Sequence, residues 1–161
     1  MAHRLGIEGA LPDDFSLALG TGEVGLLDLC AAYAALLNGG YRVEPWGVER
    51  AEADRRPVPL PPPERTRVVD AEVAAMMREM LAAVVSRGSG RAAAVPGRAV
   101  AGKTGTTQDY RDAWFVGAVG GPGGGAVIGV WLGNDDDRPM RGVSGGGLPA
   151  RLFREVAAEV R

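Results

Sequence analysis

Three strand-like runs in the C-terminal half constrain the fold more than any other feature of this sequence. Residues 99–107, 113–119 and 126–133 are short segments rich in β-branched and aromatic side chains, bounded by glycine or polar turns. The six residues 120–125 are five glycines and one proline, which predicts a hairpin connection between the last two runs. Parallel strands need a long crossover segment between them, and none separates these runs. We therefore expect an antiparallel sheet.

Helical patterns precede the predicted sheet. Residues 26–37 form an apolar run that ends at Asn38–Gly40, a stop signal for a helix. A second helix is expected from Asp70, a plausible N-cap, to the stop at Arg87–Gly88. Its apolar residues step by three and one along a single stripe, which we interpret as core. The stripe consists of Val73, Met76, Met77, Met80, Leu81, Val84 and Val85.

A third helix is predicted at the C-terminal end, after a glycine run at 145–147. Pro149 is suited to its first turn, and its apolar residues are expected on one side: Leu152, Phe153, Val156 and Val160. Helices are then available to cover one face of the sheet, which is an α+β arrangement.

The other segments carry weaker patterns. Residues 1–20 are expected to be irregular, and Tyr41–Val48 to form one or two short strands interrupted by Pro45. Residues 51–67 contain five prolines among charged residues, at 57, 59, 61, 62 and 63. This composition predicts an extended, polyproline-like surface connection within one domain, with no domain boundary there.

Composition excludes several functions. The net charge of -2 lacks the basic footprint of a nucleic-acid-binding protein. His3 is the only histidine and Cys30 the only cysteine, so a histidine-dependent triad, a zinc cluster and an internal disulfide are not expected; Cys30 is interpreted as a buried, inert thiol. We expect no cofactor. No apolar stretch approaches the roughly 20 residues of a membrane span, and no targeting signal follows Met1.

Lys103, the only lysine of the chain, lies between Gly102 and Gly105 in a run with Thr104, Thr106 and Thr107. On a strand, Lys103 and Gly105 would point to one face and Thr104 and Thr106 to the other. The pattern predicts a strand edge that binds a carboxylate or phosphate through ammonium, hydroxyl and main-chain amide groups. The alternative is an ordinary turn with a solvated lysine.

A second motif overlaps this run. Gly97–Thr104 satisfies the phosphate-loop pattern G-x-x-x-x-G-K-S/T, and Asp135 after a strand-like run could hold magnesium. That site needs a helix that opens at the lysine, so that its amides meet the phosphates. Gly105, Thr106 and Thr107 are poor helix formers, which disfavours a nucleotide-binding function without removing it.

The Lys-Thr-Gly sequence is also a motif of serine acyltransferases that act on penicillin and D-alanyl peptides. In order and spacing, the chain resembles the C-terminal half of the transpeptidase domain of class A, bifunctional penicillin-binding proteins. The segments that carry the resemblance are Ser16–Val24 with Leu27–Ala34 and Asn38–Gly40, Val68–Ala93, Lys103–Thr107, Asp109–Gly117, Gly129–Asp136 and Ser144–Ala150.

The resemblance implies that residues 1–161 are a partial penicilloyl-serine transferase (β-lactamase/transpeptidase-like) domain: α+β, with an antiparallel sheet flanked by helices and its N-terminal part missing. Lys103, Thr104, Gly105, Thr106 and Thr107 would bind substrate. The ammonium and hydroxyls would recognise the terminal carboxylate of a D-alanyl-D-alanine stem peptide or a β-lactam, and the amide of Thr106 would serve the oxyanion hole. Lys103 and Thr106 are the expected catalytic residues. Gly105 would keep the edge clear, and Trp114 and Trp131 would be sheet and core aromatics.

The family's nucleophile motif is absent from the sequence. An S-x-x-K motif needs a lysine three residues after a serine, and Val100 stands three residues before Lys103. None of the four serines has asparagine two residues later, so S-x-N is missing too.

These absences leave three hypotheses. The first is part of a peptidoglycan D,D-transpeptidase, inactive alone, whose membrane-anchored parent acts in the periplasm and supplies the missing half. The second is a non-catalytic half-domain that binds a protein or a peptide carboxylate. The third is the nucleotide binder. Without its sheet partners, the chain is expected to expose apolar surface and to be marginally stable or associating.

Overall fold

The computed structural model describes residues 1–62, 64–121 and 124–160. Pro63 of the proline-rich segment and Pro122–Gly123 of the predicted hairpin connection lie outside these residues. The helices are α1 (Leu26–Leu37), α2 (Ala71–Ser86) and α3 (Leu148–Glu159). The strands are β1 (Ala51–Ala53), β2 (Arg56–Val58), β3 (Val100–Thr106), β4 (Asp112–Gly121) and β5 (Gly124–Gly133). Short 3-10 turns occupy Ala2–Leu5, Phe15–Leu19, Arg91–Ala93 and Gln108–Tyr110.

The main sheet has the order β3-β4-β5, and both pairs are antiparallel, which confirms the prediction from the short connections. The register places Thr104 opposite Phe115, and Phe115 opposite Val130. Directly opposite residues share a face of the sheet, so this register also sorts every side chain of the three strands between the two faces.

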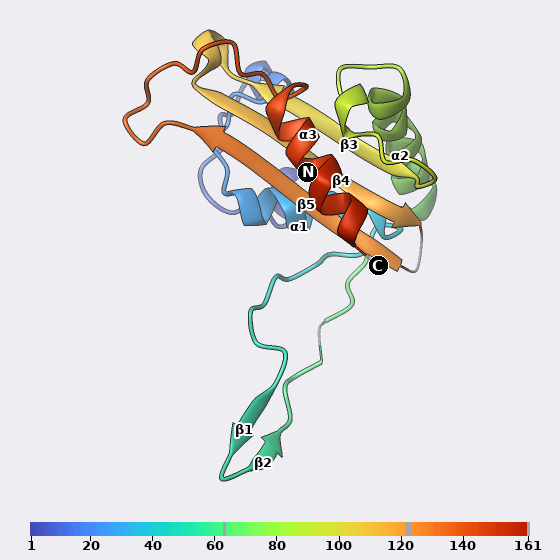
Figure 1. Cartoon of the computed structure of the whole chain (residues 1–161). Helices are drawn as coiled ribbons and strands as arrows, with labels where there is room; N and C mark the ends of the chain where they lie inside the picture. Colours follow the sequence, from blue (N-terminus) through green and yellow to red (C-terminus); the bar gives the residue numbers. More distant parts are fainter. Residues whose placement is uncertain (63, 122–123, 161) are drawn as a thin grey trace.

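Helices cover both faces of the sheet, which confirms the expected antiparallel sheet flanked by helices; the apolar patterns had indicated cover for one face (Figure 1). On one face, here called the α3 face, Phe115 packs against Phe153 with ring centroids 4.8 Å apart. On the other face, here called the α1 face, helix α1 packs directly on Gly129 of β5. A Cβ atom added to this glycine would lie 2.5 Å from the Sγ of Cys30. The strands are apolar on both sides: Val116 and Val119, on opposite faces, are both buried.

The helices bury narrower faces than their apolar stripes predict. In α2, Leu81 and Val85 are buried, but Val73, Met76 and Met80 are 40%, 55% and 57% exposed. The interpretation of the whole stripe as core was therefore wrong. The same holds in α3, where the apolar residues were expected on one side. Its buried residues are Pro149, Ala150, Phe153 and Ala157, whereas Leu152 and Val156 are exposed. Two of the four buried residues of α3, Ala150 and Ala157, are alanines, which let this helix approach the sheet closely.

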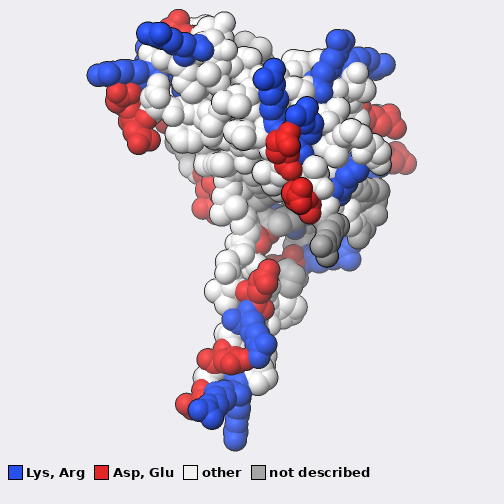
Figure 2. Space-filling model, viewed as in Figure 1, with Lys and Arg blue, Asp and Glu red and all other residues white. Residues whose placement is uncertain are grey.

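The described residues of the proline-rich segment are mostly exposed, and the segment begins with a β-hairpin. Asp54 and Arg55 adopt left-handed conformations (φ 50° and 61°) and join β1 to β2 in a two-residue turn. Figure 1 shows this arm projecting away from the body, and acidic and basic side chains alternate along it in Figure 2. The strands predicted in Tyr41–Val48 were wrong, because that segment makes only an isolated bridge between Tyr41 and Arg67.

The base of the arm is held by contacts around Tyr41. The guanidinium groups of Arg65 and Arg67 each lie 4.3 Å from the centroid of the Tyr41 ring. Arg67 also donates to the carbonyl of Gly39 and to the hydroxyl of Tyr41. These contacts tie the end of α1 to the segment that leads into α2. In the part of the chain that is described, no helix has the length and apolar character needed to cross a membrane.

Candidate anion-binding edge

β3 lies at the edge of the main sheet, and its main-chain pattern decides which groups face outward. The carbonyl of Ala99 accepts from the amide of Gly120 at 3.0 Å, and the amide of Thr107 donates to Asp112 at 3.1 Å. In an antiparallel ladder such pairing recurs at every second residue. The odd-numbered residues therefore bond to β4, and Thr104 and Thr106 direct their amides and carbonyls to the outer edge.

The side chains of the Lys-Thr-Gly segment surround this edge. By register, Lys103 and Gly105 lie on the α1 face, and Thr104 and Thr106 on the α3 face, as the strand alternation predicts. Lys103 nevertheless reaches the outer edge, because its Nζ donates to the outward carbonyl of Thr104 at 2.8 Å. Lys103 and Thr106 are exposed and Thr104 is half-buried. An ammonium group on the α1 face and two hydroxyls on the α3 face thus flank a strand edge that solvent can reach.

Thr107 and Gly105, which were also predicted to bind substrate, make contacts away from the outer edge of β3. The hydroxyl oxygen of Thr107 accepts from the amide of Asp112 at 2.7 Å, so this side chain belongs to the turn between β3 and β4 rather than to the edge. A Cβ atom on Gly105 would lie 3.1 Å from the Cβ of Trp114, which explains the glycine by crowding on the α1 face. Its role in keeping the edge clear for a substrate stays a prediction.

Sequence reasoning missed the groups that hold the two threonine hydroxyls. Ser89 Oγ lies 2.7 Å from Thr104 Oγ1, and the amide of Gly145 donates to Thr106 Oγ1 at 3.0 Å. A Cβ atom on Gly145 would overlap the carbonyls of Gly105 and Trp114, so this loop lies directly on β3 and β4. The glycine run was visible in the sequence, but its partner strand was not.

The tryptophans agree in part with their expected structural role. Trp114 and Trp131 lie side by side with ring centroids 6.2 Å apart. Trp131 is 41% exposed, and its Nε1 donates to Asp112 Oδ1 at 2.8 Å. It is a sheet aromatic but not a core residue.

The phosphate-loop hypothesis was wrong. Lys103 lies in the middle of β3, which continues to Thr106, so no helix opens at the lysine to direct amides at a phosphate. The strand after it, β4, pairs antiparallel, whereas a nucleotide-binding sheet needs parallel strands with a helical crossover.

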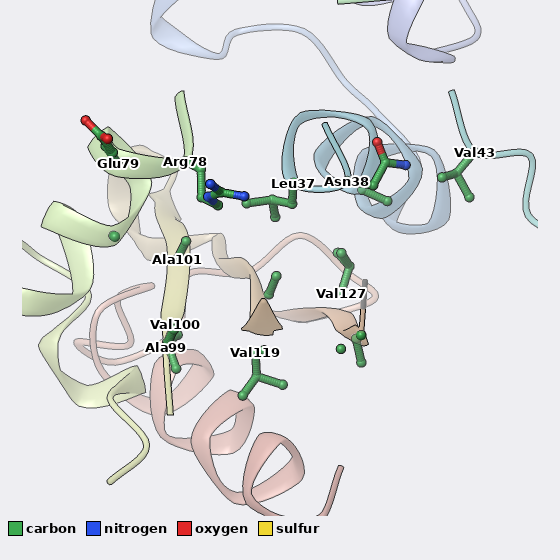
Figure 3. Close-up of a pocket in the computed structure, with 17 residues that line it drawn as sticks. Leu37, Asn38, Val43, Arg78, Glu79, Ala99, Val100, Ala101, Val119 and Val127 are labelled. Atoms are coloured by element: carbon green, nitrogen blue, oxygen red, sulfur yellow. The ribbon is translucent and has the colours of Figure 1, made fainter. Parts of the chain in front are cut away.

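A cavity of about 520 Å³ lies away from the Lys-Thr-Gly segment. It is enclosed by the end of α1, the middle of α2, the start of β3 and the hairpin end of β4 and β5, as Figure 3 shows. Its wall is mostly apolar, and Arg78 extends across it toward Leu37. None of Lys103–Thr107 lines it. Ammonium, hydroxyl and amide donors converge at the strand edge and not here, so the edge is the candidate site.

Burial changes the acid-base properties of two α1 side chains. It raises the pKa of the Cys30 thiol and the pKa of the Tyr33 hydroxyl, because the charged forms lose hydration. Cys30 is half-buried against the α1 face of the sheet, so the prediction of a buried thiol was wrong, and its lack of reactivity stays a prediction. Neither residue belongs to the edge.

Comparisons with known proteins cover nearly the whole chain. A family model described as penicillin binding protein transpeptidase domain matches residues 11–157. The chain is 42% identical over 145 residues to penicillin-binding protein 1A of Aquifex aeolicus, covering 84% of this chain and 18% of that protein. It is 37% identical over 157 residues to penicillin-binding protein 1A of a serogroup A strain of Neisseria meningitidis, covering 92% and 19%. The chain thus spans less than a fifth of these relatives.

Solved structures resemble the fold. The PonA1 protein of Mycobacterium tuberculosis, in complex with penicillin V, superposes with a TM-score of 0.81 at 22% identity, over 98% of this chain and 47% of that one. The D,D-transpeptidase domain of a peptidoglycan glycosyltransferase from Eggerthella lenta superposes with a TM-score of 0.67 at 27% identity, over 91% of this chain and 35% of that one.

Proposed function

Because the chain belongs to the penicillin-binding protein transpeptidase family, we propose that it forms the carboxylate-binding side of a D,D-transpeptidase active site. The protein that contains it would cross-link peptidoglycan at the cell envelope, on the periplasmic side of the membrane. Its substrates are stem peptides that end in D-alanyl-D-alanine, and β-lactams occupy the same place. The observation that carries this proposal is that Lys103, Thr104 and Thr106 flank the outer edge of β3, with the Lys103 ammonium on the outward carbonyl of Thr104.

The edge suits an extended peptide that ends in a carboxylate. Such a peptide aligns beside β3 as an added strand, and the outward amides and carbonyls of Thr104 and Thr106 bond to its main chain. Its carboxylate takes charge-assisted bonds from Lys103 Nζ and from the two hydroxyls. The Thr106 amide then donates to the oxygen that becomes negative when a serine attacks the peptide carbonyl.

The nucleophile must come from outside residues 1–161. Lys103 is the only lysine, and no serine precedes it by three residues, so the chain cannot form an S-x-x-K motif. Exposed apolar side chains suggest where the rest of the domain contacts it. They form stripes on α2 (Val73, Met76, Met80) and α3 (Leu148, Leu152, Val156), with Phe15 and Leu19 near the N-terminus. Covering these stripes would join the serine-bearing half to this one.

The test is penicillin labelling of the chain together with the segment encoded upstream in the same open reading frame. We expect a fluorescent penicillin to form a covalent adduct with this longer protein and not with residues 1–161 alone. Lys103→Ala should slow acylation about 10- to 100-fold, since a bond to a charged group contributes roughly 1.5–3 kcal/mol. Lys103→Arg keeps the positive charge but changes the shape of the side chain, so it is the matched control. Its acylation rate should lie between those of the wild type and Lys103→Ala. Equal labelling of the wild type and Lys103→Ala would contradict the proposal.

A second candidate function is a binding half-domain without catalysis. It is favoured by one observation: Lys103, Thr104, Thr106, Ser89 and Gly145 all belong to this chain, so the carboxylate-binding groups are complete without a nucleophile. Residues 1–161 should then bind N-acetyl-D-alanyl-D-alanine in a titration followed by nuclear magnetic resonance. An upstream segment without S-x-x-K would favour this function over the enzyme.

A further inference from the structure

The two threonine hydroxyls of β3 each have a hydrogen-bond partner within the protein, the Ser89 hydroxyl for Thr104 and the Gly145 amide for Thr106. A hydroxyl carries one proton to donate and two lone pairs that accept. For Thr106 the direction is unambiguous, because the Gly145 amide at 3.0 Å can only donate. The Thr106 oxygen therefore accepts from the protein itself, and its own proton remains available for a ligand.

For Thr104, the ligand decides the direction. Its Oγ1 lies 2.7 Å from Ser89 Oγ, and either hydroxyl can donate in the free protein. When an anion sits at the edge, the Thr104 proton turns to the anion, and Ser89 then donates into the Thr104 oxygen. The result is a chain of two hydroxyls that ends on the anion. Each bond in such a chain polarises the next and strengthens it.

We propose that Ser89 and the main-chain amide of Gly145 are positioning groups that set the hydroxyls of Thr104 and Thr106 as donors, and so make the β3 edge selective for a carboxylate over its uncharged amide. This rests on the proposed function and adds to it the origin of carboxylate specificity. With one lone pair already engaged, each threonine oxygen has a single lone pair left for the NH₂ group of an amide ligand, whereas its proton is directed to the ligand and can donate to either oxygen of a carboxylate.

The turn that carries Ser89 is rigid enough to position a hydroxyl. Gly88 and Gly90 both donate to the carbonyl of Val84, at 3.1 and 3.0 Å, which fixes the turn against the last residues of α2. A Cβ atom on Gly88 would lie 2.8 Å from the Cα of Val84, and one on Gly90 would lie 3.1 Å from the Phe115 ring. Ser89 is thus held between two glycines that have no room for side chains.

The loop that carries Gly145 is fixed from both sides. Side chains are excluded at Gly145 by the carbonyls of Gly105 and Trp114, and at Gly146 by the carbonyl of Ser89. The amide of Gly147 donates to Ser144 at 2.9 Å and closes the turn before α3. The loop therefore lies against both β3 and the Ser89 turn, so the two groups that contact the threonine hydroxyls also contact each other's segments.

The experiment measures the binding of two probes to residues 1–161, which hold every group of this proposal. The probes are N-acetyl-D-alanyl-D-alanine and its C-terminal amide, titrated while the amide signals of Thr106 and Gly145 are followed by nuclear magnetic resonance. Ser89→Ala should weaken binding of the carboxylate about 3- to 10-fold, the range for one net hydrogen bond, and leave binding of the amide nearly unchanged. Ser89→Thr should restore the selectivity. Ser86→Ala is the matched control, because Ser86 is a nearby exposed serine whose hydroxyl donates to the Ala83 carbonyl at 3.5 Å.

A double variant separates positioning from direct contact. Thr104→Val removes the hydroxyl through which Ser89 acts, so Ser89→Ala should have no further effect in that background. A persisting effect would mean that Ser89 touches the ligand itself, and it would overturn the proposal. An equal loss of affinity for both probes in Ser89→Ala would also overturn the proposal, because it would indicate a structural role for Ser89. If the wild type binds the carboxylate and Ser89→Ala binds it equally well, only this inference fails. If the wild type binds neither probe, this inference and the second candidate function both fail, and penicillin labelling of the longer protein then tests the transpeptidase function separately.

Discussion

Substituting Gly145 by alanine should destabilise the contact between its loop and β3, because the single added carbon atom has no space there. The added Cβ would overlap the carbonyl oxygens of Gly105 and Trp114 and lie 2.9 Å from the nitrogen of Gly105. These are main-chain atoms of two paired strands, so they cannot turn aside as the end of a side chain can. The loop must instead withdraw by on the order of 1 Å, a shift large enough to matter at a binding site.

The magnitude follows from two contributions. Forcing one extra carbon into a well-packed site costs roughly 1–3 kcal/mol. Withdrawal of the loop also lengthens the 3.0 Å bond from the Gly145 amide to Thr106, which contributes about 0.5–1.5 kcal/mol. We therefore expect a loss of about 2–4 kcal/mol, which for a domain of this size lowers the melting temperature by roughly 5–15 °C. Binding of the carboxylate probe should weaken as well.

Thermal melts of four proteins, followed by circular dichroism, test whether the added Cβ atom lowers the melting temperature. The wild type and Gly145→Ala are compared with Gly47→Ala, whose added Cβ meets nothing within 4 Å, and with Thr106→Val, which removes the hydrogen bond without adding bulk at the loop. Gly47→Ala should melt within a few degrees of the wild type, and Thr106→Val should lose about 1 kcal/mol. A Gly145→Ala protein as stable as Gly47→Ala would refute the steric argument.

Three further outcomes are expected. Phe153→Ala should cost about 3–5 kcal/mol in a chemical denaturation experiment, because its fully buried ring packs on Phe115; a loss below 1 kcal/mol would place this ring outside the core. Arg98 donates to the carbonyls of Ala157 and Val160 at the end of α3, so Arg98→Ala should increase hydrogen exchange there, and unchanged exchange would contradict this cap. Burial raises the pKa of Cys30 above its ordinary 9.0, so the fold favours the neutral thiol. The stability that comes from this neutral thiol is fully present below about pH 9 and is lost as the pH rises through the pKa of Cys30 in the folded protein. The wild type should therefore lose more free energy of unfolding in alkali than Cys30→Ala does.

Local patterns were sufficient for the main elements. The helix predicted at 26–37 matches α1, and the runs at 99–107, 113–119 and 126–133 match β3, β4 and β5 within a few residues. Each was specified by the spacing of apolar residues and by glycine, asparagine or proline at its ends, which act over one or two turns of chain. The β1–β2 hairpin escaped prediction because its turn uses Asp54 and Arg55, residues that adopt left-handed conformations less often than glycine.

The sequence by itself determined that Lys103, Thr104 and Thr106 lie on one strand and alternate in direction, because side-chain direction along a strand is a local property. Tertiary structure decided which edge that strand presents, which helix faces are buried, and what holds the hydroxyls. Ser89 and Gly145 lie 15 and 39 residues from their threonine partners. No local pattern specifies such a pairing. It depends on α2 and the loop before α3 packing onto the same strand, and packing is a property of the whole chain.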